Sequence, residues 1–449
     1  MKEKIVILGA GESGTGAALL AKARGFDVFV SDAAVVKDKY KGELTSNSIA
    51  FEEGGHSEEK ILDAKLIIKS PGISDKAPIM QRAATLNIPV IDEIEFAFRH
   101  TDAKIIAVTG TNGKTTTTLL TYHLMKQAGL NVALAGNVGF SMARQVAREK
   151  FDWYVLEISS YQLDGTETFK PDVAILLNIT PDHMDRYDYI MQNYVNSKFQ
   201  VIENMTRQEH FIYYADDDVI AMEVKTRSVV PQQIPVSLKS GATTPVHFDG
   251  TKMVFKLSEK FGIAQSETTL KGPHNLINTM AAVTAVYLTG TSLDSIRKGL
   301  KTFVNAPHRL ESVGVINGVE FVNDSKATNV DSVVYALGSY DKPLIWIAGG
   351  IDKGNDYDLI KEAVREKVRA LICLGKDNDK LKKAFGEVVP VIRETQSVKE
   401  LVKMSLEIAK KGDVVLLSPA CASFDLFKNY EDRGDQFRNA VKEMEKQKG

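Results

Sequence analysis

Two glycine-rich stretches of the sequence have the residue types needed to bind phosphate groups. The first, GAGESG at residues 9–14, matches the pattern GxGxxG and follows an apolar run, and Asp32 ends the next run. The second, GTNGKTT at residues 110–116, supplies glycines, a lysine and threonine hydroxyls at the start of a predicted helix. Backbone N–H groups, a cation and a hydroxyl for magnesium are the parts of a nucleotide-binding loop.

The second loop is shorter than the usual P-loop, which has four residues between its first glycine and its Gly-Lys pair. Here two residues separate Gly110 from Gly113. The loop keeps Lys114, which can follow the charge of a transferred phosphoryl group, and Thr115, whose hydroxyl can bind magnesium. The sequence therefore predicts a nucleotide site in this loop.

Two further candidates follow apolar runs that come after this loop. Glu157 ends the run WYVLE, and His183 lies between Asp182 and Asp185 after the run VAILLNIT. Ligands of open α/β sheets bind at the carboxyl ends of strands, so both side chains are candidates for magnesium binding. From spacing alone, a solvated strand end for Glu157 and a capping or core role for His183 stay open as alternatives.

The first loop has the context of a diphosphate site, with a predicted strand before it and a helix after it. A tight turn, close backbone approach and the positive end of a helix all favour a diphosphate there. The Glu12 carboxylate must then point away, because it would repel the ligand. By itself this loop indicates a nicotinamide or flavin enzyme, and a glycine turn without a ligand stays the alternative.

The elements that must position these residues are apolar runs that alternate with helical stretches. Continuous apolar runs of this length are typical of parallel strands buried on both faces, so the predicted class is α/β, doubly wound. The predicted strands are residues 4–9, 27–32, 65–70, 104–110, 153–159, 173–180, 343–349, 370–375 and 413–419.

Two joints divide the chain, near residues 91–104 and 302–312, where one set of strands and helices ends and another begins. We therefore predict three domains: a Rossmann-like domain at 1–94, a central P-loop ATPase-like domain with a parallel sheet at 95–303, and a C-terminal Rossmann-like domain at 304–449. Residues 205–270 are more polar and rich in valine and threonine, so a β excursion within the central domain is predicted there.

The composition favours an enzyme that acts on small molecules. The 449 residues contain 56 Lys and Arg against 58 Asp and Glu, a balance that favours neither nucleic acid nor an anionic membrane surface. Cys373 and Cys421 lie far apart in apolar or small-residue contexts, so both are interpreted as buried thiols. No segment has the length of a signal sequence or a membrane span, and a cytoplasmic protein is expected.

Taken together, these residues resemble the Mur ligase family of ATP-dependent amide-forming enzymes of peptidoglycan synthesis. The resemblance covers essentially the whole chain, and the short GTNGKT loop is a feature of that family. The C-terminal segment at 416–437 is most similar to the members that add D-glutamate. The other matching motifs are Glu157, NITPDHMDR, YVNSK ending at Lys198, GPHNLINTMAA, PHRLE and NDSKATN.

The resemblance implies the substrates ATP, UDP-N-acetylmuramoyl-L-alanine and D-glutamate, two Mg²⁺ ions, an acyl-phosphate intermediate and a monomeric enzyme. It implies catalytic roles for Lys114, Glu157, His183 and Lys198, and magnesium contacts for Thr115, Glu157, His183 and Lys198 as its carbamate. Without the resemblance, Lys198 would be interpreted as a surface charge.

The resemblance also assigns three sets of binding residues. The ATP positions are Gly110, Thr111, Asn112, Gly113, Lys114, Thr115, Thr116, Asn278, Arg309 and Asp324. The positions for the UDP-linked substrate are Gly11, Glu12, Ser13, Asp32, Gly72, Asn137 and His183. The D-glutamate positions are Thr328, Lys353, Ser423, Phe424 and Tyr430. One departure is Ala34, where some relatives carry arginine, so an arginine contact to the phosphate or uracil is missing there.

Three alternatives to this function stay open at the sequence level. A Mur ligase that adds another amino acid would share most of the motifs. A nicotinamide oxidoreductase would use the loop at 9–14 but leaves the loop at 110–116 and Glu157 unexplained. A non-catalytic nucleotide switch would have no use for the metal and acceptor residues.

Overall fold

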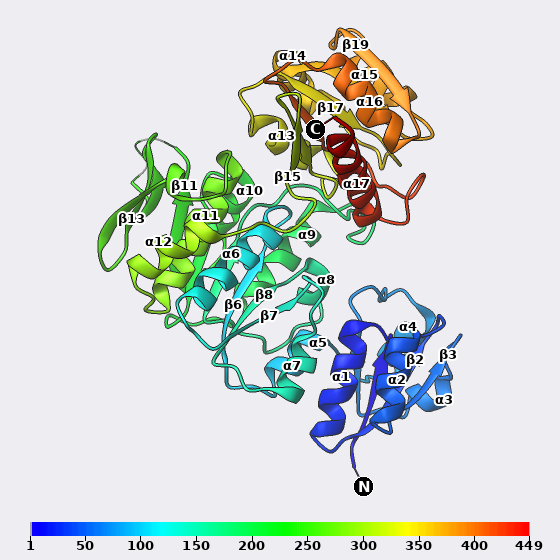
Figure 1. Ribbon diagram of the computed structural model, residues 1–449. Helices are drawn as coiled ribbons and strands as arrows, with labels where there is room; N and C mark the ends of the chain where they lie inside the picture. Colours follow the sequence, from blue (N-terminus) through cyan, green and yellow to red (C-terminus); the bar gives the residue numbers. More distant parts are fainter. Residues whose placement is uncertain (1, 240, 242, 449) are drawn as a thin grey trace. The chain divides into compact units, whose positions relative to one another are not determined.

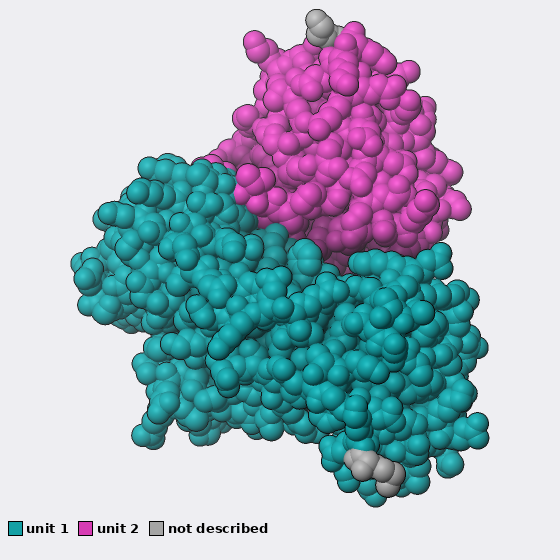
Figure 2. All heavy atoms as spheres, turned by 60° about the horizontal axis from the view of Figure 1, so that its bottom comes forward, with its two compact units in different colours: residues 1–269, 277–303 teal, residues 270–276, 304–449 magenta. Residues whose placement is uncertain are grey.

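The computed structural model describes residues 2–239, 241 and 243–448 (Figure 1). The chain forms two compact units, which Figure 2 distinguishes by colour. One consists of Met1–Thr269 and Ile277–Phe303, and the other of Leu270–Leu276 and Val304–Gly449. Among the described residues the strands form three sheets, of which two belong to the first unit.

The first sheet is parallel, with the strand order β3-β2-β1-β4-β5. Its strands are β1 (Lys4–Leu8), β2 (Asp27–Asp32), β3 (Ala50–Glu53), β4 (Leu66–Lys69) and β5 (Val90–Asp92). The helices are α1 (Glu12–Ala23), α2 (Asp38–Ser46), α3 (Glu58–Ile61), α4 (Pro78–Thr85) and α5 (Glu93–Phe98). Ile7, Leu20 and Ile94 pack on one face of this sheet, and Val6, Ile67 and Met80 on the other.

The second sheet has the order β14-β13-β12-β11-β10-β9-β6-β8-β7 and carries the loop at 110–116. Its strands are β6 (Lys104–Thr109), β7 (Val132–Gly136), β8 (Trp153–Glu157), β9 (Val173–Leu176), β10 (His210–Tyr214), β11 (Gln232–Ser237), β12 (Val246–Phe248), β13 (Lys252–Lys256) and β14 (Lys260–Ala264). The helices are α6 (Lys114–Gln127), α7 (Met142–Arg148), α8 (Ser160–Leu163), α9 (Met191–Phe199), α10 (Asp218–Thr226), α11 (Pro273–Leu288) and α12 (Leu293–Thr302), with short 3-10 turns at Gln200–Ile202 and Gln265–Glu267.

The predicted β excursion consists of the antiparallel strands β12, β13 and β14 at one edge of this sheet. The residues before it belong to the main sheet, because β10 pairs in parallel with β9 and β11 in parallel with β10. Helix α10 connects β10 to β11. The central domain therefore keeps a parallel sheet through most of its length.

The third sheet has the order β15-β16-β20-β17-β18-β19, in which only β15 is antiparallel to its neighbour. Its strands are β15 (Glu311–Ile316), β16 (Val319–Asn323), β17 (Leu344–Ala348), β18 (Val368–Leu374), β19 (Val391–Thr395) and β20 (Val414–Leu417). The helices are α13 (Val330–Gly338), α14 (Lys361–Lys367), α15 (Asp379–Phe385), α16 (Val398–Ile408) and α17 (Tyr430–Lys448), with a 3-10 turn at Tyr357–Ile360. Helices α13, α14 and α15 contribute to the core on one face, and α16 and α17 on the other.

The nine predicted strands are all present, although some are shorter than predicted; β9, for instance, ends at Leu176. Both cysteines are buried free thiols, as predicted. In the part of the chain that the structure describes, no helix combines the length and apolar character needed to cross a bilayer.

Two buried glutamates in α5 have pKa values that are shifted in opposite directions. Glu93 accepts hydrogen bonds from Ser141 Oγ (2.7 Å) and the Ala143 amide (2.6 Å). Burial still raises the pKa of Glu93, to about 7. Burial also raises the pKa of Glu95, but hydrogen bonds outweigh burial there and hold that pKa below its usual range. The donors to Glu95 are Thr168, Glu167, Phe169 and Arg99.

These two glutamates are expected to give stability profiles of opposite sign. Between about pH 4.5 and 7 the native state holds a proton on Glu93 that the unfolded state has lost. The contribution of Glu93 to the free energy of unfolding therefore falls as pH rises, by on the order of 3 kcal/mol across this range. Glu93→Gln should remove that decline. Glu95→Gln, the matched control, should instead lose stability at neutral pH, and its deficit should shrink as pH falls below about 4.5. Urea unfolding from about pH 3 to pH 8 measures both, and parallel profiles would contradict the assignment.

Candidate active site

The loop at 110–116 lies between β6 and α6, at the carboxyl end of the sheet. Gly113 has φ 84°, in the left-handed region, and is the N-cap residue of α6. A Cβ atom on Gly113 would lie 2.5 Å from Asn278 Oδ1, so only glycine lets Asn278 approach the loop this closely. The structure thus brings Asn278 of α11 close to the loop.

Asn178, which follows β9, holds the first half of the loop. Its carbonyl accepts from the Thr111 amide (2.9 Å), and its side chain both accepts from the Asn112 amide (2.7 Å) and donates to the Asn112 carbonyl (3.0 Å). The Thr111 hydroxyl donates to the Thr180 carbonyl (3.0 Å). The predicted ATP residues Thr111 and Asn112 are therefore anchored to the segment after β9, which fixes the shape of the shortened loop.

Two lysines point their ammonium groups at the same backbone oxygen of the loop. Lys114 Nζ donates to the carbonyls of Gly110 (2.7 Å) and Thr111 (2.6 Å). Lys198 Nζ donates to the Gly110 carbonyl (3.0 Å) and to Thr109 Oγ1 (3.3 Å). Lys198 is only 1% exposed, so the interpretation as a surface charge is wrong. Burial, together with the charge of Lys114, lowers the pKa of Lys198 well below its usual range.

Glu157 ends β8 directly beside β6, with Val108 and Gly136 as its neighbours in the sheet. It is 2% exposed, which excludes a solvated strand end. Its Oε1 accepts a hydrogen bond from Asn137 Nδ2 (2.6 Å), while its Oε2 is buried without a hydrogen-bond partner among the described residues. A buried carboxylate oxygen that lacks a donor is suited to a cation.

His183 lies on the segment after β9 with an unusual backbone. Its φ is 54°, and its amide donates to Asp182 Oδ1 (3.0 Å). The imidazole is about half exposed and lies 5.1 Å, centroid to centroid, from the ring of Tyr161. The alternative of a core histidine is therefore wrong, and the ring is accessible to a substrate or a metal ion.

The glycine loop at 9–14 is shaped by close backbone contacts. A Cβ atom on Gly14 would lie 1.8 Å from the Gly9 carbonyl oxygen, so the turn requires glycine there. Asp32 accepts from the amides of Ala10 (2.7 Å) and Ala34 (2.8 Å), which ties β2 to the loop. Around Gly11 and Gly72, by contrast, a Cβ would meet no atom within 4 Å, so the backbone is open to a ligand at both.

The Glu12 carboxylate, which would repel a diphosphate, is paired with an arginine. Arg144 of α7 donates to Glu12 Oε1 (2.8 Å) and to both carboxylate oxygens of Glu43 (2.7 Å each). The guanidinium compensates the charge that would repel a diphosphate. Ser13 follows in the first turn of α1 and is half-buried.

In the second compact unit, Arg309 and Asp324 lie on neighbouring segments. Residues His308 and Leu310, on either side of Arg309, have φ of 64° and 45°. Asp324 is anchored by Ser418 Oγ (2.9 Å) and the Leu310 amide (3.2 Å). Burial raises the pKa of Asp324 to about 7, although the charge of Arg309 acts in the opposite direction.

The predicted D-glutamate residues Thr328, Lys353 and Ser423 come from three loops that follow the adjacent strands β16, β17 and β20. The Ala420 amide donates to the Ala327 carbonyl (3.0 Å), which joins the first and third loops. A short bridge between Ile351 and Ala422 joins the second and third.

The side chains of these loops differ in exposure. Ser423 is buried, Thr328 and Tyr430 are half-buried, and Lys353 is exposed. The Phe424 side chain is 69% exposed. Lys326 Nζ lies 5.4 Å from the ring centroid of Tyr430, which places a cation beside that aromatic side chain.

Comparison with known proteins agrees with this arrangement. Three family descriptions match the chain: MurD N-terminal domain at residues 4–79, Mur ligase middle domain at 108–286, and Mur ligase, glutamate ligase domain at 308–421. The chain is 54% identical to UDP-N-acetylmuramoylalanine--D-glutamate ligase of Cytophaga hutchinsonii, over 99% of this chain and 100% of the relative. It is 50% identical to the ligase of the same name from Bacteroides fragilis, over 98% and 100%.

The chain belongs to the Mur ligase family. Solved structures share its fold at lower identity. A pseudomurein peptide ligase type C from Methanothermus fervidus matches with a TM-score of 0.63 and 20% identity, over 98% of this chain and 100% of that one. A UDP-N-acetylmuramate-alanine ligase from Thermotoga maritima matches with a TM-score of 0.61 and 16% identity, over 99% and 100%. The predictions of the family and of an α/β protein with three Mur ligase domains are confirmed.

Sequence reasoning missed two residues that shape the site of this Mur ligase. Asn178 holds the phosphate loop, and Arg144 neutralises Glu12. For Asn178 the motif NITPDHMDR carried a signal, because its first residue follows the strand beside the loop. Arg144 lies 132 residues from Glu12, so no local pattern indicated that pair.

No group of three or more His, Cys, Asp or Glu side chains that could hold a metal ion occurs among the described residues. A magnesium site in this Mur ligase therefore needs other oxygen ligands. Thr115 of α6 offers a hydroxyl and Glu157 a buried carboxylate oxygen, while phosphates and water are further oxygen donors. The donor types present fit magnesium.

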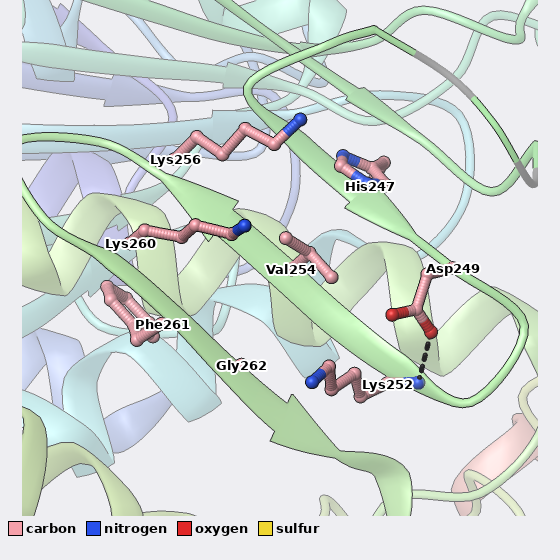
Figure 3. Close-up of a pocket in the computed structure, with 8 residues that line it drawn as sticks. All are labelled: His247, Asp249, Lys252, Val254, Lys256, Lys260, Phe261 and Gly262. Atoms are coloured by element: carbon pink, nitrogen blue, oxygen red, sulfur yellow. Dashed lines mark hydrogen bonds between the residues drawn. The ribbon is translucent and has the colours of Figure 1, made fainter.

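A separate cavity of about 470 Å³ lies over strands β12–β14 (Figure 3). It is lined by His247, Asp249, Lys252, Val254, Lys256, Lys260, Phe261 and Gly262. None of the predicted site residues is among them. The cavity therefore adds nothing to the active site of this Mur ligase.

Proposed function

We propose that this Mur ligase joins the amino group of D-glutamate to the L-alanyl carboxylate of UDP-N-acetylmuramoyl-L-alanine, with ATP as the energy source, in peptidoglycan precursor synthesis. The observation that carries the choice of substrates is the 54% identity, over 99% of the chain, to a ligase of that name. The phosphate loop beside the buried Glu157 and Lys198 supports the use of ATP.

The chemistry proceeds in two steps. A carboxylate is a poor electrophile, so the L-alanyl carboxylate oxygen first attacks the γ-phosphorus of ATP, which forms an acyl phosphate and releases ADP. The neutral amine of D-glutamate then attacks the acyl carbon; phosphate leaves with the C–O bonding electrons, and the amine gives up a proton. Both steps depend on positioning and on neutralisation of phosphate charge.

The phosphate loop supplies that neutralisation for ATP. The Lys114 ammonium lies over the loop carbonyls, within reach of phosphate oxygens that would replace those carbonyls as acceptors. The family resemblance assigns Asn278, Arg309 and Asp324 to ATP, and the closeness of Asn278 to Gly113 supports the first of these assignments. Magnesium, when bound, supplies positive charge to the phosphate oxygens; Thr115, Glu157 and His183 would hold it, with two ions expected from the resemblance.

Lys198 becomes a magnesium ligand only if its charge is reversed. Its ammonium is buried and next to Lys114, and its lowered pKa favours the neutral amine. A neutral amine adds to carbon dioxide, forming a carbamate and releasing a proton. The carbamate oxygens would carry the negative charge that magnesium prefers.

The remaining assignments concern the two other substrates. The open backbone at Gly11 and Gly72, with Glu12, Ser13 and Asp32, forms the candidate site for the UDP diphosphate. Asn137 and His183 are assigned to the sugar or peptide end, and Asn137 also orients Glu157. The D-glutamate carboxylates are assigned to Lys353, Thr328 and Ser423, with Phe424 and Tyr430 lining the site.

Phosphate release from ATP tests the proposed function. With UDP-N-acetylmuramoyl-L-alanine present, D-glutamate should stimulate release, while L-glutamate, L-alanine and diaminopimelate should not. Stimulation by another amino acid would replace the substrate assignment but keep a Mur ligase. Because ATP and UDP-sugars are cytoplasmic metabolites, we also place the reaction in the cytoplasm. We propose a monomeric enzyme, as the resemblance implies, and sedimentation of the purified protein would check its oligomeric state.

A further inference from the structure

The C-terminal helix α17 carries a buried arginine, Arg433, which lies in the segment 416–437 but was assigned no role from the sequence. Arg433 is 1% exposed, and its guanidinium donates to four oxygen atoms. The Nε group donates to Ser325 Oγ (2.9 Å), Nη2 to the Ser325 carbonyl (2.8 Å), and Nη1 to the carbonyls of Cys421 (3.2 Å) and Gly349 (3.3 Å).

These acceptors lie on the same three loops that carry the predicted D-glutamate residues. Ser325 precedes Thr328 in the loop after β16, Gly349 precedes Lys353 in the loop after β17, and Cys421 precedes Ser423 in the loop after β20. One planar group therefore contacts all three loops close to the strands from which they leave.

We infer that Arg433 is a positioning residue that sets the spacing of the loops bearing Thr328, Lys353 and Ser423, and so determines how tightly D-glutamate binds. The inference rests on the proposed assignment of those three residues to D-glutamate. Arg433 acts through the three loops and not by contact with the substrate.

The physical reason is the rigidity of the guanidinium. Its N–H groups diverge in a fixed plane, so the three carbonyls and the hydroxyl that accept from it cannot move independently. Lysine offers a single nitrogen on a flexible stem and cannot span the same acceptors. A buried guanidinium also has a large desolvation cost, which apolar packing would avoid if only stability mattered.

The charge of Arg433 persists at neutral pH. Burial lowers the pKa of Arg433, but only to about 10. The four hydrogen bonds are therefore charge-assisted under working conditions and stronger than neutral ones.

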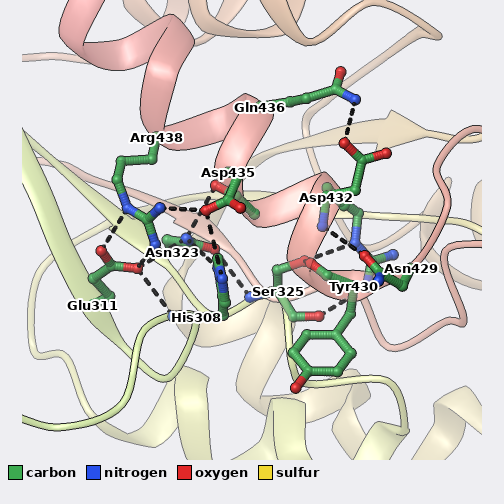
Figure 4. Close-up of polar contacts among 12 residues, drawn as sticks. His308, Glu311, Asn323, Ser325, Asn429, Tyr430, Asp432, Asp435, Gln436 and Arg438 are labelled. Carbon is green, nitrogen blue, oxygen red and sulfur yellow. Dashed lines mark hydrogen bonds and ion pairs between the residues drawn. The ribbon is translucent and has the colours of Figure 1, made fainter. Parts of the chain in front are cut away.

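Helix α17 is itself fixed to the same region on both sides of Arg433. Figure 4 shows the polar contacts that Ser325, Asn323 and Glu311 make with this helix. Ser325 Oγ donates to the Tyr430 carbonyl (2.9 Å), and Asn323 Nδ2 donates to the Gly434 carbonyl (3.2 Å). One turn further along, Arg438 donates to both carboxylate oxygens of Glu311 (2.7 and 2.8 Å). The helix thus presents Arg433 from a fixed position.

Steady-state kinetics of Arg433→Lys tests the inference. We expect the KM for D-glutamate to rise about tenfold or more. The KM for UDP-N-acetylmuramoyl-L-alanine, whose assigned residues all lie in the first compact unit, should change by less than about twofold. Val364→Ala, which removes core volume in α14 on the other face of the sheet, is the stability control. It should lower the melting temperature and leave the KM for D-glutamate unchanged.

Two outcomes would overturn the inference: an unchanged KM for D-glutamate in folded Arg433→Lys, or an equal rise for both substrates. If Arg433→Lys does not fold, Ser325→Ala, which removes one of the four acceptors, replaces it in the test. The KM for D-glutamate should then rise by a smaller factor, and the KM for UDP-N-acetylmuramoyl-L-alanine should again stay nearly constant. Lys353→Ala, measured in parallel, separates a failure of the D-glutamate site assignment from a failure of the role of Arg433. If it leaves the KM for D-glutamate unchanged, the site assignment fails; if it raises that KM and Arg433→Lys does not, only the role of Arg433 fails.

Discussion

Replacing Lys198 with alanine is expected to lower the rate of amide formation by about a thousandfold, because the variant lacks the proposed carbamate ligand of magnesium. Acetate or propionate in the buffer should restore part of the activity by placing a carboxylate in the space that the side chain leaves. The fold should persist, since Lys198 forms its two hydrogen bonds with consecutive residues, Thr109 at the end of β6 and Gly110 after it.

A spectroscopic measurement makes the test independent of activity. After incubation with ¹³C-labelled bicarbonate, the wild-type enzyme should show a carbamate carbon signal that Lys198→Ala lacks. Lys126→Ala, which changes an exposed lysine at the end of α6, is the matched control and should behave like the wild type. Full activity of Lys198→Ala without added carboxylate would contradict the carbamate proposal.

Glu157→Gln is expected to reduce kcat by about a hundredfold or more and to raise the Mg²⁺ concentration for half-maximal rate by about tenfold. The amide keeps an oxygen that can accept the hydrogen bond from Asn137, so the change removes the charge with little loss of packing. What is lost is the buried carboxylate oxygen to which none of the described residues donates a hydrogen bond.

Magnesium titrations of ATP-dependent phosphate release measure this effect. Glu149→Gln, an exposed glutamate just before β8, serves as the control and should leave the titration unchanged. A Glu157→Gln enzyme with the wild-type magnesium dependence would rule out the proposed metal contact and leave Glu157 as a partner of Asn137 alone.

Much of the fold could be predicted because buried parallel strands leave a local signal. The runs at β1, β6, β8, β17 and β20 are continuous and apolar, and each becomes a strand with both faces covered. Two of the strands that were not predicted, β3 and β19, lack that signal. In β3 no residue is fully buried, and β19 has only one buried position, at its end, so their apolar content is too low to distinguish them from loops.

The candidate site was predictable in part for a similar reason. Residues that end a strand, such as Glu157, or follow one directly, such as Asp324 and the loop at 110–116, are placed by that strand, because adjacent parallel strands end at the same edge of a sheet. No strand directly precedes Lys198 and places its side chain. It lies in the last turn of α9, and only the packing of that helix beneath the loop removes its side chain from water.

The sequence by itself determined the α/β class, the two glycine loops and the order of the motifs, since these depend on the spacing of neighbouring residues. The tertiary structure alone decided which charges are buried and what they meet: Lys198 against the Gly110 carbonyl, Glu12 against Arg144, and Arg433 against three loops. Apart from the contact between Arg433 and Cys421, each of these contacts joins segments far apart in the chain. Their energies depend on desolvation and geometry, which local spacing does not encode.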